Sequence, residues 1–478
     1  MPKIYESFDY EPIVPAGRKS SHPEEPSVSI PASHQRRPTA MGPGRPSDVT
    51  TLTANTGIKT QPSIPQTVRR GHRLSYLGLL MFTIILYFRP QEYYPSLAPV
   101  PIALMAALVT LLVFIPSQLA LDGSLTVRVR EVNLLLLLIL TALLSIPLAV
   151  SPADALHTLW DPFLKAVIVF ILIVNVVRTE RRLMGMFYLA ILVTVILCFG
   201  ALNDYRLGNL TVEGYRIKGS ITGGMFENTN DLGIHLVTMF PMVFALGLAS
   251  RKWLGKVFYW AIALLVVATI VVTFSRGSFI GLLAAVGVLA WKLARRKRAA
   301  VIISLVVSAL IFVILVPGTY WIRIASIFIS SLDPVGSSTM RSELLKQSFL
   351  VALRHPLFGI GIGNFPLVSI RSLVTHNSYT QVAAEMGMAA LLLYAMFVTA
   401  PVNPLKQIER ETLTSPNGSR FYFLSVGLQA SIFGYLFSSF FAAVAYYWFV
   451  YYLIGYAVCF RGTYREAKRS GKVVLDNK

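Results

Sequence analysis

The 478-residue sequence contains little cysteine and little charge. Its two cysteines, Cys198 and Cys459, lie in long apolar stretches, which excludes a disulfide framework and a zinc site built from cysteines. Charged residues make up 14% of the chain, whereas soluble globular domains carry about 25%. Apolar residues make up 54%. This composition predicts a protein that crosses a membrane several times.

Several enzyme signatures are also absent. The sequence has no DxD pair, HExxH helix, Walker loop or GxSxG elbow. These absences argue against metal-dependent sugar transfer from a nucleotide donor, and we expect no metal and no cofactor. The net charge of +20 does not indicate nucleic acid as a partner, because the basic residues cluster between apolar runs, as they do in cytoplasmic loops of membrane proteins.

Residues 1–73 differ in composition from the rest of the chain. They hold 11 of the 27 prolines and only 19 apolar residues, too little apolar surface to offset the entropy lost on ordering. The first apolar run begins near Leu74, so this segment is not a signal peptide. We expect a disordered cytoplasmic tail at 1–73, a membrane domain at 74–460 and a basic cytoplasmic tail at 461–478.

The fold class predicted is an all-α integral membrane protein with about twelve membrane-spanning helices. Each spanning helix needs about 20 mostly apolar residues, or slightly fewer. The qualifying runs are 74–88, 98–116, 132–150, 163–177, 183–202, 230–249, 257–274, 278–294, 300–317, 386–401, 421–439 and 440–460.

Lysine and arginine placement predicts the orientation in the membrane. With the tail inside, the inner loops and the C-terminal segment carry 22 lysines and arginines, against 10 in the outer loops. Twelve crossings place both termini in the cytoplasm. Two long outer loops follow, 203–229 and 318–385. Because most connections between helices are far shorter, a loop of 68 residues indicates a functional or disordered segment.

The large outer loop contains a predicted amphipathic helix at 338–354 that ends before Pro356. Its apolar residues recur at helical spacing: Met340, Leu344, Leu345, Phe349 and Leu353. We therefore expect an ordered helical subdomain. Farther along, Gly359, Gly361 and Gly363 in HPLFGIGIGNF indicate a tight turn, because no strand–helix unit surrounds them as in a dinucleotide site.

Two arginines of the predicted outer face are candidates for binding phosphate. Arg276, in Ser-Arg-Gly, interrupts two apolar runs; an arginine at membrane depth is costly, so it either faces a cavity or snorkels from a helix end. Arg341 lies on the polar side of the loop helix. It is either a solvated surface residue or part of a basic group that suits a phosphate-bearing ligand. The neighbours in that group are Arg323, Lys346, Arg354 and Arg371.

His376 is a candidate general base. It precedes Asn377, a predicted N-cap of a helix that we expect to run directly into the tenth membrane helix. The positive end of that helix disfavours imidazolium and should keep His376 neutral. The alternative is a capping or interfacial histidine. Arg216 lies in the Gly/Asn-rich loop 214–231, which is otherwise a flexible loop that ends in an Asn230 or Asp231 cap.

The order of these motifs resembles the O-antigen ligase and polymerase superfamily. FRPQE follows the first helix, the Gly/Asn-rich loop precedes the sixth, SRG follows the seventh, and RSELLK, HPLFGIGIGNF and HN share one outer loop. The similarity covers roughly 74–460. It implies a metal-independent, inverting glycosyltransferase of the bacterial inner membrane that takes a glycan from undecaprenyl pyrophosphate at the periplasmic face. By the resemblance, Arg276 and Arg341 bind the donor pyrophosphate, with Arg216 as a further candidate, and His376 acts on the acceptor hydroxyl.

This chemistry is consistent with the residue types. Guanidinium groups pair with phosphate oxygens in a bidentate way and stay charged, so they can stabilise a pyrophosphate leaving group without a metal. A base with a pKa near neutrality suits deprotonation of a hydroxyl. The acceptor stays open, because a ligase, a polymerase of lipid-linked repeat units and an enzyme that glycosylates protein share this donor chemistry. Alternatives from other classes are a secondary transporter, which would favour two repeated halves that we do not find, and a non-catalytic scaffold.

Overall fold

A computed structural model of the chain describes residues 71–88, 94, 96, 102–210, 217, 226, 228–315, 318–325, 337–415 and 418–473. Most of the expected disordered tail, 1–73, therefore falls outside the described residues. Arg216 also falls outside them.

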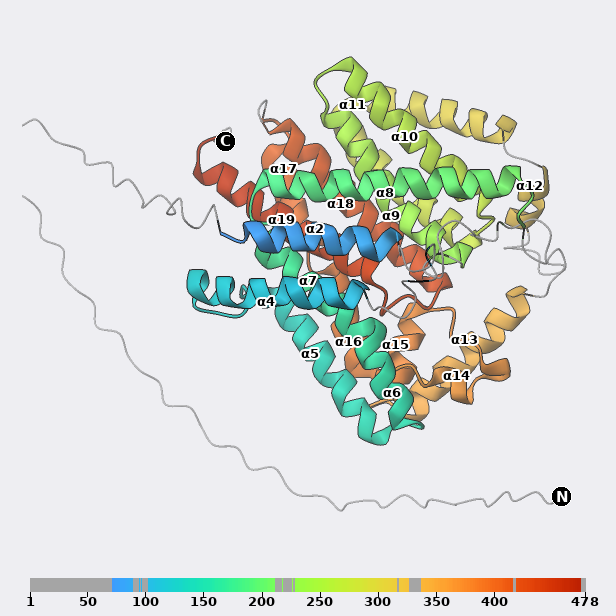
Figure 1. The fold of residues 1–478 in the computed structure, drawn as a ribbon. Coiled ribbons are helices and arrows are strands. Elements are labelled where there is room, and N and C mark those ends of the chain that lie inside the picture. The colour runs from blue at the N-terminus through green and yellow to red at the C-terminus, as the bar shows by residue number, and fades with distance from the viewer. Residues whose placement is uncertain are drawn as a thin grey trace, which may run out of the picture. The chain divides into compact units, whose positions relative to one another are not determined.

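The described residues form helices (Figure 1), and the only strand-like pairing among them is an isolated bridge between Leu210 and Ile217. The all-α prediction is confirmed. In the first half the elements are α2 (Arg73–Phe88), α4 (Ile102–Asp122), α5 (Arg130–Ser145), η2 (Ile146–Leu148), α6 (Pro152–Thr158), η3 (Leu159–Leu164), α7 (Lys165–Val176), α8 (Glu180–Arg206), α9 (Thr229–Ala249) and α10 (Trp253–Val272). In the second half they are α11 (Arg276–Leu315), α12 (Gly318–Ala325), α13 (Ser337–Arg354), α14 (Phe365–Val368), η6 (Ile370–Ser372), α15 (Ser378–Met386), α16 (Met388–Thr399), α17 (Val402–Thr412), α18 (Ser419–Ser438), η7 (Ser439–Phe441) and α19 (Trp448–Arg469).

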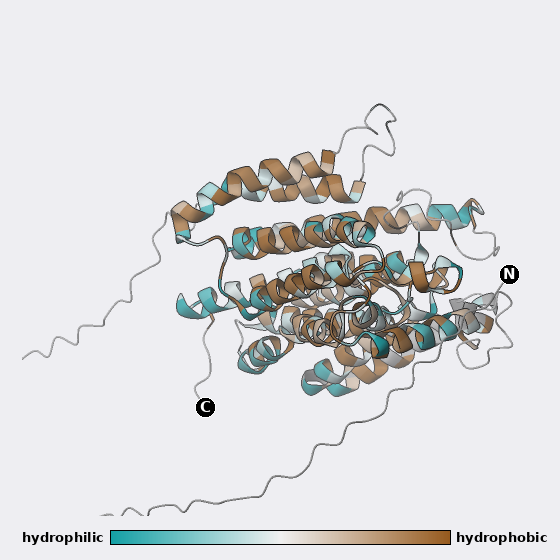
Figure 2. Cartoon of the chain, turned by 90° about the horizontal axis from the view of Figure 1, so that it is seen from below, coloured by the Kyte–Doolittle hydropathy of each residue, from teal (hydrophilic) through white to brown (hydrophobic). Residues whose placement is uncertain are grey.

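Nine helices in the described part of the chain are long and apolar enough to cross a membrane, and α2 is a shorter apolar helix. Apolar residues occupy the central parts of these helices and polar residues gather toward many of their ends (Figure 2). The expectation of a polytopic membrane protein is thus confirmed, whereas the exact count of twelve is not. One difference is the continuity of α11, because the expected span 278–294 and the described part of the expected span 300–317 belong to one 40-residue helical element. The connecting residues include alanine, lysine and arginine, which are good helix formers, and no glycine or proline.

The packing of α9 against α18 forms a central part of the buried core. Gly427 and Gly434 of α18 lie against α9, where added side chains would meet Ala245 and Val237 respectively. The Ser431 hydroxyl donates to the carbonyl of Thr238 over 2.6 Å. Small residues and a polar contact at a helix interface suit membrane helices, whose backbones must approach closely to pack well.

The predicted loop helix is present as α13, and its packed face matches the expected one only in part, at Met340 and Leu344. Leu344, Ser348 and Ala352 are buried against the segment that follows, whereas Phe349 and Leu353 are more than half exposed. Apolar spacing identified the helix correctly. It could not choose the buried face, because a buried serine that bonds a neighbouring helix carries no hydropathy signal.

The glycine-rich segment forms the predicted tight turn. Gly359, Gly361 and Gly363 all have positive φ angles, of 67°, 101° and 75°, which glycine adopts at little cost. The expected continuous helix from Asn377 into the membrane is wrong, because Gly387 breaks it between α15 and α16 with a φ of 89°. A Cβ atom at Gly387 would meet the carbonyl oxygen of Leu357 at 2.4 Å, so the break lets the turn pack against α15 and α16.

Candidate functional site

Arg276 is the first residue of α11, and its neighbours explain why the helix begins there. The Ser275 hydroxyl accepts a long hydrogen bond from the backbone N–H of Ser278, as an N-cap does. The same hydroxyl donates to Oδ1 of Asn230 on α9 over 2.9 Å. Ser275 and Ser278 are buried, whereas Arg276 is half-buried. The Ser-Arg-Gly motif thus places one guanidinium group at the N-terminus of a long helix.

Gly277, the third residue of this motif, brings α11 close to η7. A Cβ atom at Gly277 would lie 2.6 Å from Cβ of Phe441. Only glycine therefore fits without displacing the turn that joins α18 to α19. The close contact fixes the start of α11, and with it the backbone of Arg276, beside η7.

His376 lies directly before α15, and its backbone has a left-handed conformation with a φ of 51°. Its side chain is half-buried. The predicted cap is confirmed, because Oδ1 of Asn377 accepts from the backbone N–H groups of Tyr379 and Thr380 at 2.9 and 3.0 Å. The N-cap of α9, by contrast, is Asn228 rather than the expected Asn230 or Asp231.

The turn after α18 also contacts the start of α15. The Ser378 hydroxyl donates to the carbonyl of Ala442 over 2.7 Å and accepts from the backbone N–H of Val444 at 3.0 Å. The Tyr379 hydroxyl donates to the carbonyl of Leu436 over 2.7 Å. The segment 436–444 is therefore held by the residues that follow His376 and, through Phe441, by the residue that follows Arg276.

Arg341 lies on α13, which packs against α15. The hydroxyl groups of Ser348 and Thr380 are 2.9 Å apart and join the two helices. Arg341 lies two helical turns before Ser348, on the same face of α13. Its side chain is half-buried. The structure thus brings the helices of Arg276, Arg341 and His376 together around α15 and the 436–444 segment.

Sequence reasoning missed several buried polar atoms beside this segment. Within the described ranges, Nδ2 of Asn377, Oε1 of Gln381 and Oγ of Ser438 have no hydrogen-bond partner. Asn377 and Gln381 lie one turn apart on α15, and their exposed fractions are 2% and 8%. Buried polar groups without partners are rare and indicate a place for a ligand or water. In the sequence, the only indication that these two amides lie together was their spacing of four residues in HNSYTQ.

Glu385 has the features of an anchor rather than those of an accessible base. It is 2% exposed, and its carboxylate accepts hydrogen bonds from the backbone N–H groups of Gly363 and Phe365 and from the Tyr446 hydroxyl. These bonds fix the glycine turn between α13 and α15. Across the described residues, no three His, Cys, Asp or Glu side chains gather in a way that could hold a metal ion.

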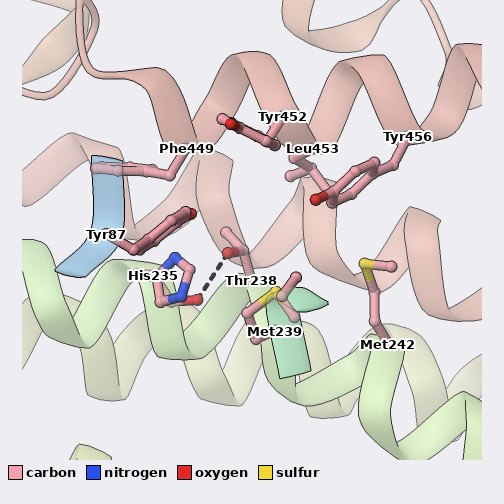
Figure 3. A pocket seen from close by; sticks show the side chains of 10 residues that line it. Tyr87, His235, Thr238, Met239, Met242, Phe449, Tyr452, Leu453 and Tyr456 are labelled. Carbon is pink, nitrogen blue, oxygen red and sulfur yellow. Dashed lines mark hydrogen bonds between the residues drawn. The ribbon is translucent and has the colours of Figure 1, made fainter. Parts of the chain in front are cut away.

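A small buried cavity lies between α2, α8, α9 and α19, farther along α9 than Asn230. His235 and Thr238 face Tyr87, Tyr452 and Tyr456 across it (Figure 3). Nδ1 of His235 has no hydrogen-bond partner among the described residues. The space is about 10 Å³, near the lower limit for one water molecule. This cavity is too small for a substrate.

Comparison with known families gives one match. Residues 260–395 match the family model described as O-antigen ligase. The matched segment contains Arg276, Arg341 and His376, together with the glycine turn, α13 and α15. No curated protein matches the chain. Over residues 260–395 the family match confirms the resemblance found in the sequence, and it supports a membrane glycosyltransferase of the O-antigen ligase or polymerase type.

Proposed function

We propose that this chain transfers a glycan from a polyprenyl-pyrophosphate donor, undecaprenyl pyrophosphate by the family resemblance, to an acceptor hydroxyl at the periplasmic face of the bacterial inner membrane. One observation carries the proposal: Arg276 and His376 both adjoin residues that hold the 436–444 segment, and their side chains are half-buried. The family match over 260–395 supports the type of reaction.

In this mechanism Arg276 binds the donor pyrophosphate. A helix N-terminus presents backbone N–H groups and the positive end of the helix dipole, which favours anions. Arg276 adds a guanidinium that remains protonated and can donate two parallel hydrogen bonds to phosphate oxygens. Negative charge grows on the leaving pyrophosphate as the glycosidic bond breaks, and these donors stabilise it without a metal. Arg341 of α13 contributes a second guanidinium, and Arg216, outside the described residues, is a further candidate.

His376 accepts the proton of the acceptor hydroxyl as that oxygen attacks the anomeric carbon. Attack opposite the leaving group inverts the anomeric centre. The amide groups of Asn377 and Gln381, which retain unused polar atoms, lie at the same end of α15 and suit hydrogen bonding to sugar hydroxyls. Their polarity provides a physical reason for a glycan to occupy this side of α15.

The test is transfer by the full-length protein in lipid nanodiscs supplied with a polyprenyl-pyrophosphate oligosaccharide that carries a fluorescent label. A labelled product on a separate lipid acceptor would identify a ligase. A ladder of longer lipid-linked glycans without added acceptor would identify a polymerase. Absence of both products with active donor, in a preparation that is correctly folded, would contradict the proposal.

A further inference from the structure

A groove of about 750 Å³ runs between α8 and α10. Its walls are five residues of α8 from Tyr188 to Phe199 and five residues of α10 from Phe258 to Leu265. All are aliphatic or aromatic, and the only side-chain polar atoms are the hydroxyl groups of Tyr188 and Tyr259. Both helices are candidate membrane spans. An apolar groove on them therefore suits a ligand that is apolar along most of its length.

The length of the groove matches one leaflet of a bilayer. On the α8 wall, Phe199 lies eleven positions after Tyr188, which corresponds to about 17 Å at 1.5 Å per helical residue. The hydrocarbon core of a bilayer is about 30 Å thick, so one leaflet is about half of that. A groove of this length suits a single acyl chain that lies parallel to the helices.

The tyrosine end of the groove has the features of a membrane interface. The side chains of Tyr188 and Tyr259 interact with each other there. Trp253 and Trp260, close by on α10, are 70% and 43% exposed. Exposed tryptophan and tyrosine side chains are enriched at the level of lipid headgroups, where one part of the ring is apolar and the other is hydrated.

The same end of the groove is basic. Lys256 lies one turn before Tyr259 on the same face of α10, and Arg420 of α18 interacts electrostatically with Tyr259. Arg420 also forms an ion pair of 2.7 Å with Glu180, the first residue of α8, and keeps 42% of its side chain exposed. Arg181 in the first turn of α8 and Lys252, the N-cap of α10, are exposed. Lys256 and Arg420 thus give this end of the groove a basic character, with further exposed cations near the starts of both helices.

We propose that this groove binds one anionic phospholipid of the bilayer. Its acyl chain lies between α8 and α10, and its phosphate contacts Lys256 and Arg420. Charge complementarity selects the headgroup, because basic pockets between membrane helices attract anionic lipids. The site is independent of the proposed transfer reaction. Its basic end is at the start of α10, whereas Arg276 follows the other end of this 20-residue helix, about 30 Å away.

The direct test is native mass spectrometry of the full-length protein in a neutral detergent, titrated with phosphatidylglycerol or with phosphatidylcholine of the same acyl chains. We expect phosphatidylglycerol to be retained about tenfold more tightly. The double variant Lys256→Ala/Arg420→Ala should lose this preference. The matched control Arg465→Ala/Arg469→Ala removes two exposed basic residues of α19 and should keep it.

A second pair of variants tests the acyl-chain part of the groove. Ala261 is an exposed residue of the groove wall, so Ala261→Trp fills the groove without entering the core. Leu264, on the same helix, is 64% exposed and does not line the groove, which makes Leu264→Trp the control for folding. We expect lipid retention to fall at least tenfold in Ala261→Trp alone. Equal retention of both phospholipids, or unchanged retention in the double variant or in Ala261→Trp, would overturn the proposal. The proposal would also be overturned if the protein retained a polyprenyl phosphate more tightly than phosphatidylglycerol and if Ala261→Trp abolished that retention.

Discussion

The carboxylate of Glu385 on α15 accepts a hydrogen bond from the hydroxyl of Tyr446, 2.7 Å away, in the segment that precedes α19. The same carboxylate accepts from the backbone N–H groups of Gly363 and Phe365, at 3.0 and 3.4 Å. One buried side chain thus connects the glycine turn, α15 and the segment before α19. These are the elements that support His376, so we expect the state of Glu385 to affect both stability and transfer.

The first prediction concerns the substitution Glu385→Gln. The amide group of glutamine has one acceptor oxygen where the carboxylate has two, and its NH₂ group would face donors. A buried polar group left without a partner costs about 1–3 kcal/mol, so the apparent melting temperature and the transfer rate should both fall. Thermal unfolding in detergent at a pH above 7, where the carboxylate is ionised, measures the first quantity when followed by intrinsic fluorescence. Glu343→Gln, an exposed carboxylate of α13, is the control, and equal melting temperatures for the two variants would contradict the anchoring role.

The second prediction is a dependence of stability on pH. Burial raises the pKa of Glu385 to about 7, from an ordinary value of 4.5, and its three hydrogen-bond donors limit the rise. Between these pH values the folded chain keeps a proton that the unfolded chain has lost, so stability should fall as pH rises from about 4.5 to about 7. Melting temperatures measured across this window should show a steeper decrease for the wild type than for Glu385→Gln. The same slope in both proteins would remove Glu385 as the cause.

The third prediction concerns the two arginines. Arg276→Ala and Arg341→Ala should each lower turnover about 10²–10³-fold, as removal of one charge-stabilising donor does. Lysine should rescue poorly at both positions, because it keeps the charge but loses the planar pair of donors. Initial rates with labelled donor in nanodiscs measure the effect. Arg410→Ala, which removes an exposed arginine of α17 outside the large outer loop, should retain near-wild-type turnover. A similar rate for Arg341→Ala would indicate that Arg341 is a solvated surface residue.

The fourth prediction concerns orientation. Single cysteines at Asn209 and Lys346 should react with a membrane-impermeant thiol reagent from the periplasmic side, because both positions are exposed and lie in the predicted outer loops. A cysteine at Ala299, in the basic segment of α11, should react only after the membrane is opened. Cys198 and Cys459 are buried and are replaced in the background. The reverse labelling pattern would invert the predicted topology.

Local chemistry explains which parts of this fold were predictable. Asn377 as a helix cap and Gly359, Gly361 and Gly363 as a turn follow from properties of single residues, and both predictions are confirmed. The buried face of α13 and the break at Gly387 depend on tertiary neighbours. Ser348 is buried where its hydroxyl bonds to that of Thr380, and the backbone of Leu357 lies against Gly387 where the helix breaks.

In the candidate site, too, the properties of single residues were predictable from the sequence and the tertiary contacts were not. The residue types of Arg276 and His376 and the order of their motifs could be interpreted in terms of phosphate and hydroxyl chemistry. That the 436–444 segment contacts the neighbours of both could not be predicted, because it depends on a glycine contact and on serine hydrogen bonds between helices distant in sequence. The anchoring role of Glu385 also depends on Tyr446, 61 residues farther along the chain.

The last prediction assigns the base. His376→Ala should lose about 10²–10⁴ in turnover, the usual contribution of general-base catalysis, while donor binding remains, because donor affinity is assigned to the arginines. A general base works only in its unprotonated form, so wild-type activity should fall at acidic pH, and this acid limb should be missing from the residual activity of the variant. His355→Ala, which removes an exposed histidine next to α13, should keep both the rate and the pH profile of the wild type. Transfer rates across pH, together with equilibrium binding of labelled donor, separate the possibilities. Loss of donor binding in His376→Ala would make His376 a phosphate ligand, and full turnover with an unchanged acid limb would leave it with a role only in the turn before α15.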